Sequence, residues 1–208
     1  MTFVKICGIT NLDDALAAVD AGADALGFNF YKPSPRYVAP DVAREIVSRL
    51  PTTILTVGVF VNERSPQWVE DLARRASVTA IQLHGDESPD YCRAIENRYV
   101  IKALAAGADF DMRSALDYDV DAILLDAKHH ALRGGTGRVF DWSIAIEARR
   151  AIPKLYLAGG LGIENIEDAI NSVDPFAVDA CSALEETPGK KSHERMRAFV
   201  RAIRSVKP

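Results

Sequence analysis

The feature that most constrains this fold is an alternation of short apolar runs and helix-like segments, which recurs about every 25 residues along all 208 residues. Eight runs have the length and the glycine or proline borders of buried strands: residues 3–6, 24–30, 54–61, 80–84, 99–103, 121–126, 154–158 and 176–180. Helix patterns follow them at residues 11–21, 40–50, 65 onwards, 88–96, 109–117, 142–151, 164–171 and 194–206. Eight such units predict an α/β fold, a closed (βα)8 TIM barrel rather than an open doubly wound sheet.

Length and composition agree with one domain over residues 1–208 and exclude several classes of protein. The net charge of -4, with acidic and basic residues interleaved, predicts no broad basic face for nucleic acid. Three scattered cysteines form neither a disulfide framework nor a metal spacing, which favours a reducing, cytoplasmic setting. Because no apolar stretch approaches a membrane span and the N-terminus lacks a signal-peptide pattern, we expect no membrane partner.

The first unit brings a cysteine to a strand-to-helix loop. The run at residues 3–6 breaks at Cys7 and Gly8, and Thr10 with Asp13 offers a cap for the first helix. Side chains alternate along a strand, so Lys5 lies beneath Cys7 on the same face. A free cysteine usually serves as a small buried hydrophobe, but in a barrel of this kind the C-terminal strand ends form the active face.

Glycine and serine at the ends of the last two strands predict a phosphate site. Gly159 and Gly160 follow the seventh strand, and Ser182 and Ala183 follow the eighth. Backbone N–H groups at these loops commonly hold phosphate in such barrels. A glycine pair is by itself more often a simple connector, so the prediction depends on the two loops being neighbours.

Other strand ends supply candidate acid, base and binding groups. Asp126 closes an apolar run that could raise its pKa by desolvation, although a rim aspartate can also simply cap a loop. His84 is a candidate base or binding group, and Asp179 ends the eighth strand. The segment Gly134-Gly-Thr-Gly137 lacks the lysine of a nucleotide loop and is interpreted as a mobile flap. No spacing of histidines and carboxylates suggests a metal site.

Seven short motifs, in order along the whole chain, resemble the phosphoribosylanthranilate isomerase family. They are Lys5-Ile-Cys-Gly-Ile-Thr10, Ser34-Pro-Arg-Tyr37, Gln82-Leu-His-Gly85, Leu124-Leu-Asp126, Gly134-Gly-Thr-Gly137, Gly159-Gly-Leu161 and Phe176-Ala-Val-Asp179. The resemblance implies the Amadori rearrangement of N-(5-phosphoribosyl)anthranilate to 1-(2-carboxyphenylamino)-1-deoxyribulose 5-phosphate in tryptophan biosynthesis. It implies no cofactor, and the chain could be a monomer or a homodimer.

The resemblance also assigns roles to residues. Cys7 corresponds to the general base and Asp126 to the general acid, while Arg36 faces the anthranilate carboxylate. We expect His84 and Asp179 to contact the substrate as well. The phosphate is expected against Gly159 and Gly160 on one side and Ser182 and Ala183 on the other.

The eighth unit departs from the family pattern. The family usually reads Val-Asp-Val-Ser-Ser-Gly-Val-Glu, whereas this chain has Val178-Asp-Ala-Cys-Ser-Ala-Leu-Glu185. Ala183 replaces a glycine of the phosphate loop, which matters only if that position needs a positive φ. Cys181 replaces a serine.

Two rival functions remain at this point. Another phosphosugar isomerase or epimerase barrel would keep the phosphate loops but usually lacks the set of Cys7, Arg36 and Asp126. A catalytically silent barrel could bind a phosphorylated metabolite as a sensor, but intact acid and base positions argue against it.

Overall fold

The computed structural model describes residues 1–107, 109–126 and 142–206. In chain order it contains β1 (Phe3–Cys7), α1 (Leu12–Asp20), β2 (Ala25–Asn29), α2 (Pro40–Val47), β3 (Leu55–Phe60), α3 (Pro66–Arg75), β4 (Ala80–Leu83), α4 (Pro89–Arg93), β5 (Tyr99–Ala105), α5 (Met112–Leu116), β6 (Ala122–Asp126), α6 (Ser143–Ala151), β7 (Leu155–Ala158), α7 (Ile166–Val173) and β8 (Ala177–Ala180). A 3-10 turn (Ser182–Leu184), β9 (Glu185–Thr187), β10 (Lys190–Lys191) and α8 (His193–Ser205) complete the described chain.

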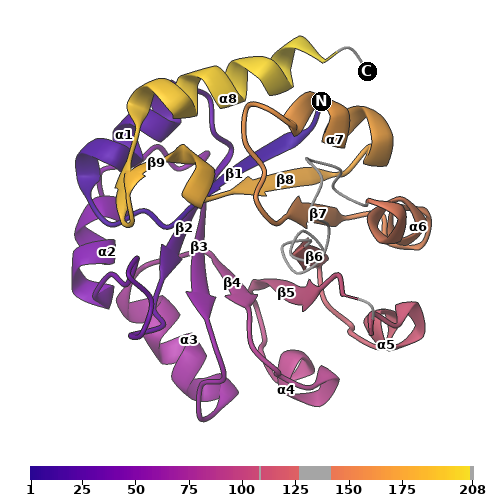
Figure 1. Cartoon of the computed structure of the whole chain (residues 1–208). Helices are drawn as coiled ribbons and strands as arrows, with labels where there is room; N and C mark the ends of the chain where they lie inside the picture. Colours follow the sequence, from indigo (N-terminus) through magenta and orange to yellow (C-terminus); the bar gives the residue numbers. More distant parts are fainter. Residues whose placement is uncertain (108, 127–141, 207–208) are drawn as a thin grey trace.

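Strands β1 to β8 form a closed parallel barrel, which confirms the predicted fold class (Figure 1). Each strand pairs with the next along the chain, and β1 closes the ring by pairing with β8. The register at this closure sets Lys5 opposite Asp179 and Ile6 opposite Ala180. All strand C-terminal ends therefore meet at one face, where the predicted site residues lie.

Two apolar clusters hold the barrel together, one on each face of the strands. The outer cluster packs strand residues such as Ile6, Phe28 and Leu125 against the helices. The inner cluster fills the barrel with small and aliphatic side chains, including Ala25, Val57 and Leu124, and with the buried Tyr156. Because both faces of each strand are covered, the strands are nearly continuous apolar runs, as parallel sheets require.

The helix caps follow sequence signals, with one change from prediction. Ser65 and Ser88 cap α3 and α4, each with proline at the next position. The first helix is capped by Asn11, whose side chain accepts from Asp14 N–H, and not by Thr10. The Thr10 hydroxyl instead donates to the Gly189 carbonyl at 2.5 Å, so it joins the first loop to the β9–β10 turn. Helices α4 and α5 are also shorter than predicted.

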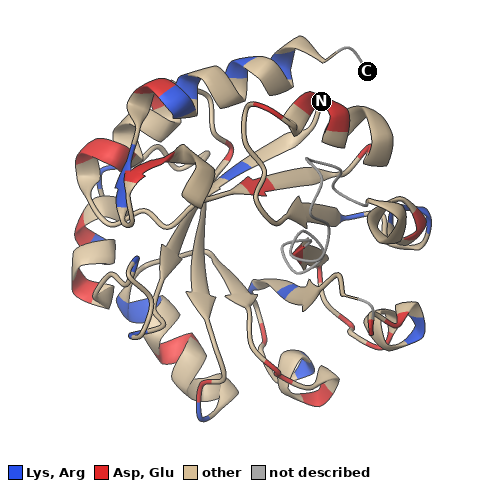
Figure 2. Cartoon of the chain, in the orientation of Figure 1, with Lys and Arg blue, Asp and Glu red and all other residues tan. Residues whose placement is uncertain are grey.

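The β9–β10 hairpin is an element that the sequence patterns did not predict. It follows β8 and precedes α8, which packs against α1 and α7 (Figure 1). Its short strands consist mainly of charged residues, and two of these, Glu185 and Lys191, are buried. Charged residues of both signs lie mainly on the outer helices and their loops (Figure 2). No helix in the described part of the chain is long and apolar enough to cross a membrane.

Candidate active site

A cavity of about 250 Å³ opens at the C-terminal ends of the barrel strands. Nearly every site residue predicted from the sequence lines this cavity. Its lining is Cys7, Asn29, Arg36, Val59, Val61, Gln82, His84, Asp126, Ala158, Gly159, Gly160, Leu161, Asp179, Cys181 and Ser182. Of the predicted site residues, Ala183 alone lies outside this lining, one position beyond Ser182.

A buried ion pair lies beneath the Cys7 thiol. Lys5 Nζ donates to Asp179 Oδ1 at 2.9 Å, and the two side chains are 0% and 8% exposed. Burial opposes the charged form of Lys5, but attraction to Asp179 and Cys7 outweighs it and raises the Lys5 pKa. Burial raises the pKa of Asp179 to about 6 in spite of Lys5. The lysine is therefore a fixed cation under the cysteine.

The surroundings of Cys7 favour its thiolate. A hydrogen bond with Cys181 and the charge of Lys5 lower the pKa of Cys7 well below its ordinary value, against the opposing effect of burial. Lys191 acts in the same direction. Gly27 on the neighbouring strand leaves room for the sulfur, because any larger residue would place its Cβ 2.7 Å from Cys7 Sγ. Cys7 is thus a half-buried thiol of lowered pKa at the cavity wall.

Arg36 is held at the cavity edge by the hairpin. Its Nε and Nη2 donate to Glu185 Oε1 and Oε2 at 2.7 and 2.6 Å, a bidentate pair. Glu185 also accepts from Lys191 Nζ at 3.0 Å. Although burial opposes it, the contacts with Arg36 and Lys191 lower the pKa of Glu185. The pair fixes the guanidinium plane, and neither of these two bonds uses Nη1.

His84 and Asp126 face each other across the opening. His84 Nε2 lies 3.8 Å from Asp126 Oδ2, and their side chains are 35% and 27% exposed. The amide of the buried Gln82 contacts His84 Nδ1 at 2.8 Å. With Gln82 as donor, the neutral imidazole carries its proton on Nε2, which is directed towards the aspartate.

The two predicted phosphate loops lie side by side. Gly159 and Gly160 have φ values of +99° and +73°, a backbone turn that side chains rarely allow. A Cβ at Gly162 would meet the Cβ of Ala183 at 3.1 Å, so the loop after β7 contacts the turn after β8. Ala183 does not have a positive φ. The alanine that departs from the family pattern is therefore compatible with this backbone.

The sequence patterns did not point to four buried charged residues around the site: Glu185, Lys191, Lys102 and Glu87. Lys102 Nζ donates to Glu87 Oε2 at 2.7 Å and to the Gly85 carbonyl at 2.6 Å, which ties down the loop that carries His84. For Lys102 the sequence does carry a signal, because a lysine inside an apolar strand is unusual, as it is at Lys5. The predicted flap at Gly134 to Gly137 lies outside the described residues.

The described residues offer no group of three His, Cys, Asp or Glu side chains that could hold a metal ion. The chemistry available in the cavity is instead that of a thiolate, a carboxyl group, a fixed guanidinium and backbone N–H groups. The fold and this site define a (βα)8-barrel enzyme whose active site lies at the strands' C-terminal ends.

Comparisons with known proteins identify the family. The family model for N-(5'phosphoribosyl)anthranilate (PRA) isomerase matches residues 4–202. The N-(5'-phosphoribosyl)anthranilate isomerase of Thermotoga neapolitana is 48% identical over 207 residues, covering 99% of this chain and 100% of that protein. The chain belongs to the PRA isomerase family.

Solved structures of family members superpose closely. The crystal structure of the enzyme from Thermotoga maritima gives a TM-score of 0.90 at 47% identity, covering 98% of this chain and 99% of that chain. A family structure in complex with reduced 1-(o-carboxyphenylamino)-1-deoxyribulose 5-phosphate gives 0.88 at 45% identity, with the same coverage.

Proposed function

We propose that this chain catalyses the Amadori rearrangement of N-(5-phosphoribosyl)anthranilate to 1-(2-carboxyphenylamino)-1-deoxyribulose 5-phosphate in tryptophan biosynthesis. The observation that carries the proposal is one cavity that holds Cys7, Asp126 and Arg36 beside two neighbouring glycine and serine loops. The family structure with a reduced form of the product bound supports the choice of substrate. The reaction is an intramolecular aldose-to-ketose isomerisation that needs no cofactor.

Asp126 is the general acid of this proposal. It protonates the ring oxygen as the C1–O bond breaks, and the anthranilate nitrogen supplies the electron pair that makes the imine. His84, whose Nε2 lies 3.8 Å from Asp126 Oδ2, borders the same opening and contacts the sugar. Substrate binding excludes water and brings negative charge to the site, and both effects favour the protonated carboxyl group.

Cys7 is the general base. Its thiolate removes the C2 proton of the protonated imine, the C2–H electron pair forms the C1=C2 bond, and the C1=N electron pair returns to the anthranilate nitrogen. Tautomerisation of the resulting enolamine gives the C2 ketone. An ordinary thiol is only a few per cent ionised at pH 7. The lowered pKa of Cys7, caused first by the bond with Cys181 and then by Lys5, provides the base at neutral pH.

Arg36 and the two loops hold the ends of the substrate. The guanidinium, oriented by Glu185, binds the anthranilate carboxylate through donors that the ion pair leaves available. Backbone N–H groups at Gly159, Gly160, Ser182 and Ala183 bind the phosphate. Asp179 contacts the substrate from the barrel interior while its Oδ1 accepts from Lys5.

We also propose the wider setting of the protein. The chain acts as one catalytic domain in the cytoplasm, with a small phosphorylated molecule as its partner and no contact with nucleic acid or membrane. One of the related structures is of monomers generated from the dimeric phosphoribosylanthranilate isomerase of Thermotoga maritima, so both a homodimer and a monomer remain possible for this chain. A phosphosugar isomerase of another specificity is the rival activity, and it would not need Arg36.

The proposal is tested by turnover of freshly made phosphoribosylanthranilate, followed by the loss of its anthranilate fluorescence. The wild type should turn it over, and Cys7→Ala should lose ~10²–10⁴-fold in kcat with the fold unchanged. Asp126→Asn keeps the shape but has no proton to give, so kcat should fall far more than KM changes. Cys92→Ala, at a thiol 1% exposed in the outer cluster, is the matched control.

Substrate recognition has its own test. Arg36→Met should weaken substrate binding but leave the affinity for inorganic phosphate unchanged. A folded Cys7→Ala enzyme with full activity, or equal losses for substrate and phosphate in Arg36→Met, would contradict the corresponding role.

A further inference from the structure

We propose that Cys7 and Cys181 form a reversible disulfide when the enzyme meets a peroxide, and that this bond switches the active site off. The loss of activity rests on the role proposed above for Cys7, whereas the bond itself does not. Cys7 and Cys181 are two of the three cysteines of this chain.

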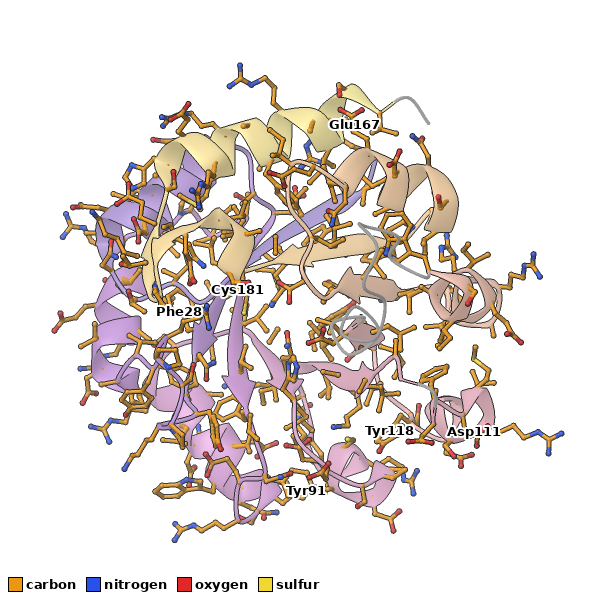
Figure 3. The ribbon with its side chains drawn as sticks, in the orientation of Figure 1. Phe28, Tyr91, Asp111, Tyr118, Glu167 and Cys181 are labelled. Carbon is orange, nitrogen blue, oxygen red and sulfur yellow. The ribbon has the colours of Figure 1, made fainter. Side chains whose placement is uncertain are left out.

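The strand register brings the two residues together. Lys5 pairs with Asp179 and Ile6 with Ala180, and the next residues are Cys7 at the end of β1 and Cys181 directly after β8. Adjacent strands lie about 4.7–4.9 Å apart, within the Cα separation of about 4.4–6.8 Å that a disulfide needs. Both side chains point to the barrel interior and line the same cavity. Figure 3 places the labelled Cys181 near the centre of the ring of strands, away from the outer helices.

The contacts of the two sulfurs are asymmetric, as an attacking and a resolving thiol require. The hydrogen bond with Cys181 and the charge of Lys5 lower the pKa of Cys7, which makes it the reactive thiolate. The same hydrogen bond and burial raise the pKa of Cys181, which keeps its proton while Cys7 is negative. Cys7 therefore reacts first.

Oxidation of Cys7 reverses this arrangement. The Cys7 thiolate attacks one peroxide oxygen, the O–O bond breaks, and the sulfur becomes a neutral sulfenic acid while hydroxide leaves. The negative charge that held the Cys181 proton is then gone, and Lys191 Nζ, 3.7 Å from Cys181 Sγ, favours the Cys181 thiolate. That thiolate attacks the sulfenic sulfur and displaces hydroxide. Together, two thiols and hydrogen peroxide give one disulfide and two waters.

Cys92 provides the internal control. It is 1% exposed in the cluster between strands and helices, and burial raises its pKa to about 11. A buried thiol of raised pKa is a poor nucleophile. The third cysteine of the chain should stay reduced under conditions that oxidise the pair.

The experiment treats wild type, Cys181→Ser and Cys92→Ala with hydrogen peroxide, then measures free thiols, non-reduced peptide masses and turnover before and after dithiothreitol. Wild type should lose two thiols, yield a peptide joined through Cys7 and Cys181 that is lighter by two hydrogens, and lose activity ~10²–10⁴-fold as the base disappears. Dithiothreitol should restore both thiols and activity. Cys92→Ala should behave like wild type.

Cys181→Ser, compared with its own untreated activity, should form no such peptide. It should pass instead to sulfinic acid at Cys7, which dithiothreitol does not reverse. Three results would overturn the proposal. They are a wild-type pair that stays reduced after peroxide, a disulfide that includes Cys92, or full recovery of Cys181→Ser activity after dithiothreitol. If the linked peptide forms but turnover of phosphoribosylanthranilate was absent beforehand, the proposed function fails while the thiol pair stands.

Discussion

At the scale of the residue, the site depends on charges that lie inside the barrel. Lys5 is a buried cation shared by Asp179 and Cys7, both of which are anions when ionised. One cation does not neutralise two anions in a buried site, so one of the two acids has to hold its proton more tightly. The structure assigns that raised pKa to Asp179 and the lowered one to Cys7.

This arrangement predicts how stability depends on pH through Asp179. Its pKa is about 6 in the folded chain and about 3.9 in an unfolded one, so folding favours the protonated form. The stability contributed by this group is fully present below about pH 4 and is lost as pH rises through about 6. Relative to Asp179→Asn, the wild type should lose up to about 3 kcal/mol of unfolding free energy across that window.

Urea unfolding of both proteins at several pH values measures this difference. The direction in which this stability difference changes with pH is what tests the prediction. If the advantage of the wild type grew from pH 4 to pH 7, the ion pair with Lys5 would dominate over burial, and Asp179 would be an ordinary ionised carboxylate.

At the scale of the element, the β9–β10 hairpin contributes the group that orients Arg36. Glu185 begins β9 and Lys191 ends β10, and both are buried where the hairpin meets the barrel. Lys191 Nζ also donates to the Cys181 carbonyl at 3.1 Å. A short hairpin thereby joins Arg36 to the turn after β8.

Glu185→Gln should therefore raise KM roughly tenfold, because a hydrogen bond to a charged partner is lost and Arg36 is less firmly held. The turnover number should change little, since no reacting atom is involved. Glu186→Gln, at the neighbouring side chain that is 50% exposed, is the control and should leave KM unchanged. Equal KM values in the two variants would show that Arg36 does not depend on the hairpin.

The loop after β4 depends on a second buried pair. Lys102 and Glu87 are each 1% exposed, and Glu87 also accepts from Gly85 N–H at 2.9 Å. Lys102→Met removes the cation and leaves a buried carboxylate, which should cost ~3–5 kcal/mol of unfolding free energy. Adding Glu87→Gln to it should recover part of this loss.

Urea unfolding of the single and double variants checks this expectation. Arg74→Met removes an exposed pair with Asp71, with side chains 68% and 59% exposed, and should cost at most about 1 kcal/mol. A Lys102→Met protein as stable as Arg74→Met would mean that the pair does not hold the loop.

At the scale of the whole molecule, the sequence predicts the barrel because each unit repeats the same local rules. Apolar runs of strand length, serine caps before Pro66 and Pro89, and Gly22 after the first helix all act over a few residues. Strand order then follows from short connections, and the barrel places Cys7, Arg36 and Asp126 at one face. That much of the site could be predicted.

The remaining contacts are set by closure of the ring, which local patterns do not encode. Lys5 and Asp179 are 174 positions apart and meet only because β1 pairs with β8. The pair of Arg36 with Glu185 spans 149 positions and depends on a hairpin whose charged strands carry no apolar alternation. The partners of the predicted residues therefore had to come from the structure.

The central claim is that the Cys7 thiolate is the base of the reaction, and one measurement tests it directly. The acid limb of kcat/KM reports the pKa of the essential base in the free enzyme. The rate at which iodoacetamide alkylates Cys7, followed by peptide mass in the Cys92→Ala protein, reports the pKa of that thiol. We predict that both curves fall with decreasing pH at the same midpoint, well below the ordinary thiol value of about 8.5. Two separate midpoints, or an alkylation midpoint at or above 8.5, would contradict the account.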